Sequence, residues 1–342
     1  MKSRSKFFLG LILVTFIIAL GVFLSKASPT AKKSDDSTKL SSVQSTDDNS
    51  TSVSDGILFL TNSSDATNIY SFSPSDKTKK IIFTDKDENL KIKQCQSLTL
   101  DGKKILATFG TQNDNFISSL WFIASDGKGD KEKLLDNFAS PSAPIISPDG
   151  KKIAYTVFSN VEFDYGFSLL TANTDGTNKQ TIDKDKGSIA NINFSPDGQY
   201  ILYTKGTESG KSGLYKTNLN SHKNEEIYSL KDKEAIYSVT VSKNNQVAIS
   251  MGTIGNNLLN EAEIYILDIN GKNMSKLFSN DTHENYLSFS PDGTKLAYLS
   301  IKYDANPKNA NIPGTINLAD VGNKTFVSLG QDADVIIGWL VK

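Results

Sequence analysis

Residues 146–158 read Ile-Ser-Pro-Asp-Gly-Lys-Lys-Ile-Ala-Tyr-Thr-Val-Phe, and this stretch predicts a tight turn that leads into a β-strand. Pro148 fixes φ at the first central position of the turn, and Asp149 tolerates the second. Gly150 adopts the left-handed conformation that a short hairpin loop requires. The residues Ile153–Phe158 that follow are rich in β-branched and aromatic side chains, which favour a strand.

The same turn recurs along the chain at a nearly constant period. Its central Asp or Asn lies at positions 101, 149, 197, 244 and 292, so the steps between turns are 48, 48, 47 and 48 residues. A period of this size is typical of solenoids, propellers and repeat arrays. Each repeat holds four short strand-like runs, which in the third full repeat are Ala190–Ser195, Tyr200–Thr204, Gly213–Thr217 and Glu225–Tyr228. Four strands in a unit of about 40–50 residues indicate a propeller blade.

The two ends of the repeat region predict how the ring closes. Ile57–Thr61, Asn68–Phe72 and Lys80–Thr84 resemble the second, third and fourth strands of a blade that lacks its first. Val335–Val341 resembles a first strand with nothing after it. Together they form one blade, which removes an open sheet edge. With five full repeats between them, the sequence predicts an all-β protein: a six-bladed β-propeller of four-stranded antiparallel blades, closed by the C-terminal strand.

The Ser-Pro-Asp-Gly-Lys-x-Ile-Ala-Tyr repeat resembles that of TolB-type propellers, a WD-repeat-like group, over residues 56–342. Propellers of this type occur as periplasmic interaction proteins, as accessory domains of serine peptidases and as modules of unknown role. TolB carries an additional domain before its propeller, and the peptidases carry an α/β-hydrolase domain after it. We recognise neither in this sequence. The resemblance implies the fold strongly and the function only broadly.

The region before the propeller predicts export. Three basic residues lie among the first six, and Phe7–Leu24 is an uncharged apolar run of 18 residues. At about 1.5 Å per residue a helix of this length nearly spans a bilayer core. We therefore expect residues 1–27 to be a transmembrane anchor with the propeller outside. The alternative is a signal peptide cleaved after Ala27, because Ser25 and Ala27 have the small side chains that cleavage requires. Residues 28–55 are rich in Ser, Thr and Asp, which predicts a disordered linker.

Composition narrows the classes of partner. The formal net charge is −1, whereas a nucleic-acid partner would require a basic surface, so none is expected. Cys95 is the only cysteine, so no intrachain disulfide can form, and a buried, inert thiol is the expected role.

Catalytic and metal-binding patterns are weak. The predicted innermost strands supply no carboxylate and no histidine toward the axis, and only Asn191 and Asn193, with Asp334 at the rim, could bind calcium there. Residues 183–187, Asp-Lys-Asp-Lys-Gly, resemble a calcium loop but lack its other ligands, so a solvated loop is expected. The only histidines, His222 and His283, are expected to be exposed, and the sequence contains no Gly-x-Ser-x-Gly elbow. We therefore expect no metal, no cofactor and no enzymatic activity.

The connections between strands predict a binding face. In a four-stranded meander the first-to-second and third-to-fourth connections share one face of the ring, and here they are short and alike. The opposite face carries longer, unlike loops at residues 110–117, 159–166, 251–260 and 302–312. Binding residues concentrate in such loops, and exposed aromatic side chains favour recognition. The candidate binding residues are Phe116, Phe163, Tyr165 and Tyr303 from these loops and Phe138 from a loop between blades.

Two interpretations of these aromatic residues remain open, because they could also fold back over the blades. We expect a membrane-anchored, non-catalytic propeller that binds another envelope or extracellular protein. The alternative is an enzyme or carbohydrate-binding module that acts on an extracellular or cell-wall polymer at the channel mouth.

Overall fold

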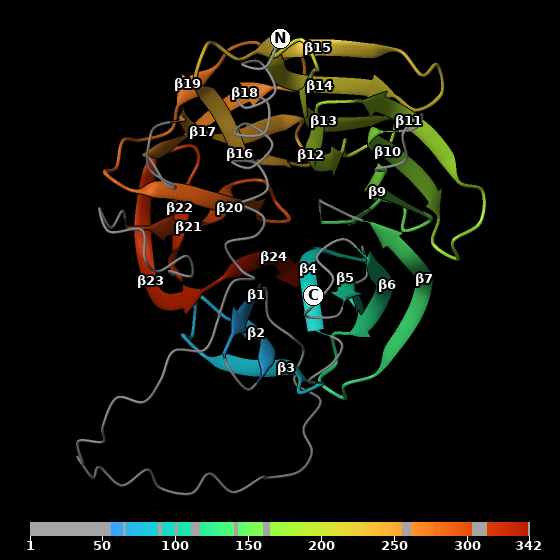
Figure 1. Ribbon diagram of the computed structural model, residues 1–342. Helices are drawn as coiled ribbons and strands as arrows, with labels where there is room; N and C mark the ends of the chain where they lie inside the picture. Colours follow the sequence, from blue (N-terminus) through green and yellow to red (C-terminus); the bar gives the residue numbers. More distant parts are fainter. Residues whose placement is uncertain are drawn as a thin grey trace, which may run out of the picture.

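The computed structural model describes residues 56–63, 66–87, 91–99, 102–110, 117–139, 143–159, 165–254, 261–302 and 313–340. In this part of the chain the secondary structure consists of strands, and the sheets stand side by side in a ring (Figure 1). The predicted anchor and linker, residues 1–55, lie outside the described residues. Within the described ranges, no helix is long and apolar enough to span a membrane.

Four of the sheets are separate antiparallel blades of four strands. The closing blade contains, in order, β24 (Val335–Leu340), β1 (Gly56–Asn62), β2 (Thr67–Phe72) and β3 (Lys79–Asp85). The next contains β4 (Lys91–Leu98), β5 (Lys104–Gly110), β6 (Ile117–Ala124) and β7 (Lys131–Ala139). The third contains β8 (Ile145–Ile146), β9 (Lys152–Ser159), β10 (Gly166–Asn173) and β11 (Gln180–Asp185). The fourth contains β12 (Ser188–Phe194), β13 (Tyr200–Gly206), β14 (Ser212–Asn218) and β15 (Asn224–Ser229).

The fifth sheet is eight-stranded and has two halves. One half contains β16 (Glu234–Val241), β17 (Gln246–Thr253), β18 (Ala262–Asp268) and β19 (Ser275–Lys276). The other half contains β20 (His283–Phe289), β21 (Lys295–Ile301), β22 (Gly314–Asp320) and β23 (Thr325–Ala333).

The prediction of six separate blades is therefore wrong in one respect, because two of the expected units share a sheet. A single parallel residue pair, Ala262 with His283, joins the two halves. The amide of Ala262 also donates a hydrogen bond of 3.3 Å to the carbonyl of Thr282. His283, the first residue of β20, is fully buried at this junction, so the start of β20 packs against β18 and is not exposed to solvent.

Strand β24, from the end of the described chain, pairs antiparallel with β1, as the sequence predicts. The innermost strands contact one another in the order β24, β4, β8, β12, β16, β20 and back to β24. The hydrophobic core lies between neighbouring blades: Ile57, Phe59 and Phe72 of the closing blade, for example, pack with Leu299 and Ile316 of the β20–β23 half. Cys95 belongs to the next such cluster and is 1% exposed, and burial raises the pKa of its thiol.

The repeated turn owes its shape to its serine and aspartate. In the opening stretch, Ser147 Oγ donates to Asp149 Oδ1 at 2.6 Å, and the same oxygen accepts the amide of Lys151 at 3.1 Å. Gly150 has a φ of 70°, the left-handed conformation expected of it. The serine–aspartate bond recurs in the equivalent turns at Ser195–Asp197, 2.5 Å, and Ser290–Asp292, 2.6 Å.

Small polar side chains join the innermost strands of neighbouring blades by hydrogen bonds. Ser97 accepts the amide of Ile146 at 3.0 Å, and Ser238 accepts the amide of Leu287 at 3.0 Å. Asn193 Nδ2 donates to the carbonyl of Val239 at 2.8 Å. These side chains therefore connect the innermost strands of neighbouring blades through backbone groups that strand pairing alone does not join.

Candidate functional site

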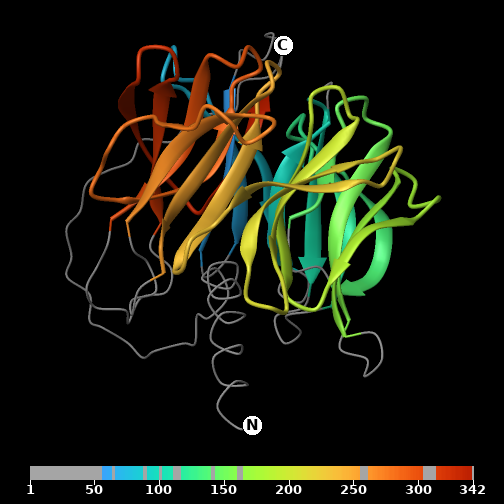
Figure 2. The ribbon, with the colours of Figure 1, turned by 90° about the horizontal axis from the view of Figure 1, so that it is seen from above.

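The strands run between two unlike faces of the ring, which Figure 2 shows from the side. We call the face with the first-to-second and third-to-fourth connections the turn face, and the opposite one the loop face. Because successive strands are antiparallel, the first residues of the first and third strands of each blade lie at the loop face, and so do the last residues of the second and fourth strands. The candidate site is built from these strand ends.

Tyr165 is the predicted binding residue that the structure describes best. It directly precedes β10, and its side chain is 41% exposed. Its ring meets Phe158 edge-on at a centroid distance of 5.5 Å, and Phe158 packs on Phe167 at 4.9 Å. Gly166 follows with a φ of 138°, and a Cβ there would lie 2.5 Å from the carbonyl of Asp185. Tyr165 is thus anchored on one edge by a rigid hairpin and open to solvent on the other.

The other predicted residues have different outcomes. Phe116, Phe163 and Tyr303 lie outside the described residues. Phe138 was expected in a loop between blades, and this is wrong: it lies within β7. The strand continues through it because β6 and β7 remain paired at Ser118–Phe138 and Ile117–Ala139. Of the five candidates, only Tyr165 is placed at the loop face with a described side chain.

A buried carboxyl group lies at the start of β20. Glu284 is 1% exposed and accepts hydrogen bonds from the hydroxyls of Thr282 and Ser300, at 2.5 and 2.7 Å, and from Asn280 Nδ2 at 3.1 Å. Asn317 in turn donates to Ser300 Oγ at 2.8 Å. Burial raises the pKa of the Glu284 carboxyl, and the three hydrogen bonds oppose that rise. The three partners of Glu284 and Asn317 are all neutral, so within the described residues the network supplies no cation to balance an ionised Glu284.

His283 was expected to be exposed, and this is wrong: it is fully buried, and its ring meets that of Tyr237 at 4.5 Å. The sequence offered a signal, because His283, Glu284 and Asn285 are three consecutive polar residues at the start of an innermost strand, and all three are buried. The repeat spacing predicts a later start for this strand, which leaves His283 in a loop between blades. His222, by contrast, is exposed in the turn between β14 and β15, as expected.

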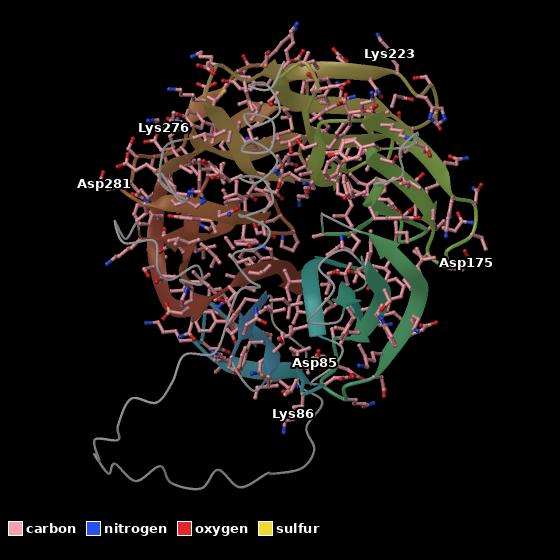
Figure 3. The ribbon with its side chains drawn as sticks, viewed as in Figure 1. Asp85, Lys86, Asp175, Lys223, Lys276 and Asp281 are labelled. Carbon is pink, nitrogen blue, oxygen red and sulfur yellow. The ribbon has the colours of Figure 1, made fainter. Side chains whose placement is uncertain are left out.

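Two further carboxyl groups at the loop face have raised pKa values. Asp85 ends β3 and is 3% exposed; burial raises its pKa, and its Oδ2 atom has no hydrogen-bond partner among the described residues (Figure 3). Asp334 precedes β24, accepts the amide of Asn62 at 2.5 Å, and has its pKa raised mainly by burial. Figure 3 also shows Asp175, Lys223 and Asp281 at the outer rim, where both signs of charge face solvent.

Residues 183–187 were expected to form a solvated loop, and this is wrong for the aspartates. Asp183 and Asp185 belong to β11, and both pair with Lys205 Nζ, at 2.8 and 3.4 Å. Their side chains are 8% and 17% exposed, and that of Lys205 is 12% exposed. Tyr203 adds a hydrogen bond of 2.7 Å to Asp183. These carboxylates therefore have a lysine as their partner. Across the described ranges, no group of three or more acidic, histidine or cysteine side chains could hold a metal ion.

Comparisons with known proteins agree with the fold. Residues 151–307 match the family model of the TolB beta propeller domain. TolB from Acinetobacter baumannii superposes with a TM-score of 0.64 at 17% identity, over 84% of this chain and 66% of that one. A chain of the nidogen/laminin complex superposes with a TM-score of 0.58 at 11% identity, over 84% of this chain and 97% of that one. The fold is therefore that of a TolB-like β-propeller.

Enzymes also appear among the similar proteins. Dipeptidyl-peptidase 5 of Porphyromonas endodontalis is 30% identical over 111 residues, which are 32% of this chain and 15% of the peptidase. A puromycin hydrolase superposes with a TM-score of 0.53 at 16% identity, over 78% of this chain and 42% of that one. This chain thus spans less than half of either enzyme. These matches contradict the expectation that the chain is not an enzyme. That expectation was based on the lack of a catalytic motif, but peptidases and hydrolases are among the proteins that share this fold.

Proposed function

We propose that this chain is an exported propeller, held in the cell membrane through residues 7–24, that binds an envelope or extracellular protein at its loop face. We further propose that the two halves of the eight-stranded sheet act as two blades, so that six surround the axis. The observation that carries the binding role is Tyr165, an aromatic side chain that is 41% exposed and fixed by Phe158 on the loop face. A tyrosine ordered before binding loses little entropy in a complex, which favours its use as an anchor.

Two further observations support a protein partner. The turn face carries repeated turns whose serine and aspartate side chains form hydrogen bonds with each other and with backbone amides of the same turn. A propeller similar in fold also occurs in the nidogen/laminin complex, where it is part of a protein–protein assembly. We propose that the contact surface includes Tyr165 and the other predicted residues, Phe116, Phe138, Phe163 and Tyr303.

A photo-crosslinking residue in place of Tyr165 tests the proposal in the full-length chain in its own membranes. A matched variant carries the same residue in place of Asp175, which is exposed on the turn face of the same blade. We expect a crosslinked protein adduct from position 165 and none from position 175. Adducts from position 175 alone would place the binding face on the turns and reject the proposal.

The match to Dipeptidyl-peptidase 5 favours a second candidate function, a propeller that works with a peptidase active site. A histidine-dependent step carried by this chain would use one of its two histidines, His222 or His283. Purified full-length protein should then release 4-nitroaniline from dipeptidyl-4-nitroanilides, and His222→Gln or His283→Gln should abolish the release. If activity appears only after a second protein is added, the propeller is the accessory partner of that protein.

A further inference from the structure

Three of the four large hydrophobic residues that the described part of the chain exposes lie on two outermost strands. Ile81 of β3 is 53% exposed, and Phe326 and Val327 of β23 are 42% and 58% exposed. Strands β3 and β23 belong to neighbouring units of the ring, the closing blade and the β20–β23 half, and both lie at the rim (Figure 1). Clustered exposed apolar side chains on a soluble surface mark an interaction site more often than scattered ones do.

Ile81 and Val327 lie on surfaces that face each other. Ile316 of β22 belongs to the core cluster between the closing blade and the β20–β23 half. Val327 pairs with Leu318, which lies two residues after Ile316 on the same side of β22. Tyr70 packs into that cluster from the closing blade, and Ile81 is its cross-strand partner. Val327 and Ile81 therefore border the outer end of the seam between the two units.

Phe326 lies on the opposite side of β23 and contacts Phe278, with a centroid distance of 4.9 Å. Strand β23 thus exposes apolar side chains on both of its sides. A strand added along its edge would cover both sides at once, because successive side chains of the added strand also alternate.

The edge of β23 lacks the protection that the other outermost strands have. Natural proteins guard open edges with charged residues or with very short strands. Strands β3, β7, β11 and β15 each carry at least two charged residues, and β19 is only two residues long. Strand β23 spans nine residues and carries no charge from Thr325 to Gln331. Its pairing with β22 is regular over Thr325–Ser328, before a bulge at residues 329–331.

We propose that Thr325–Ser328 of β23 pairs antiparallel with the same segment of a second copy of this chain. Lys324 precedes the uncharged stretch and Asp332 follows it, and within the described residues neither forms an ion pair. An antiparallel copy brings the Lys324 end of each strand toward the Asp332 end of the other, whereas a parallel copy would bring like charges together. The contact is isologous, so two copies close the edge and no further copy is recruited.

Thiol crosslinking of the full-length protein in membranes with a bismaleimide tests this interface. Ser328→Cys places a thiol in the pairing segment, and the native Cys95 is buried. Ser229→Cys is the matched control, because Ser229 is also exposed at an outermost strand, but one that carries Glu225 and Glu226. Antiparallel pairing of residues 325–328 places Ser328 opposite Thr325 of the second copy, so the two introduced thiols lie beyond direct disulfide distance and a bismaleimide bridges them. We expect a bismaleimide-linked dimer from Ser328→Cys and none from Ser229→Cys. The proposed membrane anchor would concentrate the copies of each variant to the same extent. The control therefore accounts for crosslinks that arise only from proximity in the membrane.

A second substitution separates edge pairing from chance collision. Val327→Lys in the Ser328→Cys background adds a charge to the edge and should abolish the dimer, whereas Val327→Thr, an uncharged strand former, should keep it. Val327 is 58% exposed, so both variants should melt like the parent. Equal dimer yields from Ser328→Cys and Ser229→Cys, or a dimer that persists with Val327→Lys, would overturn the proposal. So would a crosslinked product whose mass shows a different protein. Crosslinks from position 165 concern the other surface and are independent of these outcomes.

Discussion

The hydroxyl of Ser300 donates a hydrogen bond of 2.7 Å to the carboxyl group of Glu284, and both belong to a network of neutral side chains. Glu284 comes from β20 and Ser300 from β21, where they are cross-strand partners. An ionised carboxylate buried without a cation is costly, and three neutral donors reduce that cost only in part.

The first prediction follows from the raised pKa of Glu284. Because its folded pKa lies above the usual 4.5, the folded protein binds a proton that the unfolded chain releases between the two values. The free energy of unfolding therefore falls as the pH rises from 4.5 through the folded pKa. Glu284→Gln removes this contribution. Urea unfolding at pH 5 and pH 8 should show a smaller loss of stability for the variant than for the parent, and an identical loss would contradict the role assigned to Glu284.

The second prediction concerns Asp292, whose pKa is lowered to about 2, chiefly by the hydrogen bond from Ser290. Here the unfolded chain binds the proton more tightly, so the contribution to stability is present above 3.8 and is lost as the pH falls toward 2. Ser290→Ala should reduce stability at pH 6 and have less effect at pH 2. Thermal melts across this range measure the difference between the two proteins, and a difference that does not change with pH would contradict the assignment.

The third prediction concerns Gly150, whose φ is 70° and whose absent Cβ would meet no atom within 4 Å. Gly150→Ala should therefore cost about 1 kcal/mol, from the left-handed backbone alone. Gly322→Ala is the matched control, because Gly322 also lies in a turn but is not in the left-handed region, and its only close atom is 3.6 Å away. Equal effects of the two substitutions on urea unfolding would show that the conformation of the repeated turn is not the cause.

Sequence reasoning succeeded where the signal was local and repeated. The turn at Ser147–Gly150 and the pairing of β24 with β1 follow from patterns that backbone geometry dictates. It failed where the outcome depended on which side chains meet across blades. The burial of His283 beside Tyr237 and the pairing of Lys205 with Asp183 connect different strands, and no spacing in the sequence reports either contact.

The candidate site was predicted less well than the fold, for a related reason. Tyr165 was singled out from its loop, but its support by Phe158 depends on the register of β9 and β10, which places Phe158 opposite Phe167. Glu284 was missed because its partner Ser300 and Asn317, which donates to Ser300, lie on two other strands and look like ordinary polar residues in sequence.

The fourth prediction tests the hydrogen bonds between blades. Ser238 is 8% exposed and accepts the amide of Leu287 from the neighbouring innermost strand. Ser238→Ala leaves that amide without its partner and should destabilise the domain by about 1–3 kcal/mol. Ser229→Ala, at an exposed position, should change stability little. Similar effects of the two substitutions would show that water replaces the lost hydrogen bond.

The last prediction concerns closure of the ring. Removal of residues 332–342 deletes β24, which pairs with β1 and covers Ile57 and Phe59, both fully buried. The deletion also removes the hydrogen bond of 3.1 Å from Trp339 Nε1 to the carbonyl of Ser288, which ties β24 to β20. The truncated chain should therefore aggregate or unfold without cooperativity, because a sheet edge and an apolar surface are exposed together. A synthetic peptide of residues 332–342, added during refolding, should restore the cooperative transition by occupying the vacant edge, as strand addition does in other proteins. The same peptide with Ile336 and Ile337 replaced by Asp should fail to restore it, because both side chains are buried in the intact ring. A truncated protein that melts like the full chain would show that β24 is not required to close the propeller.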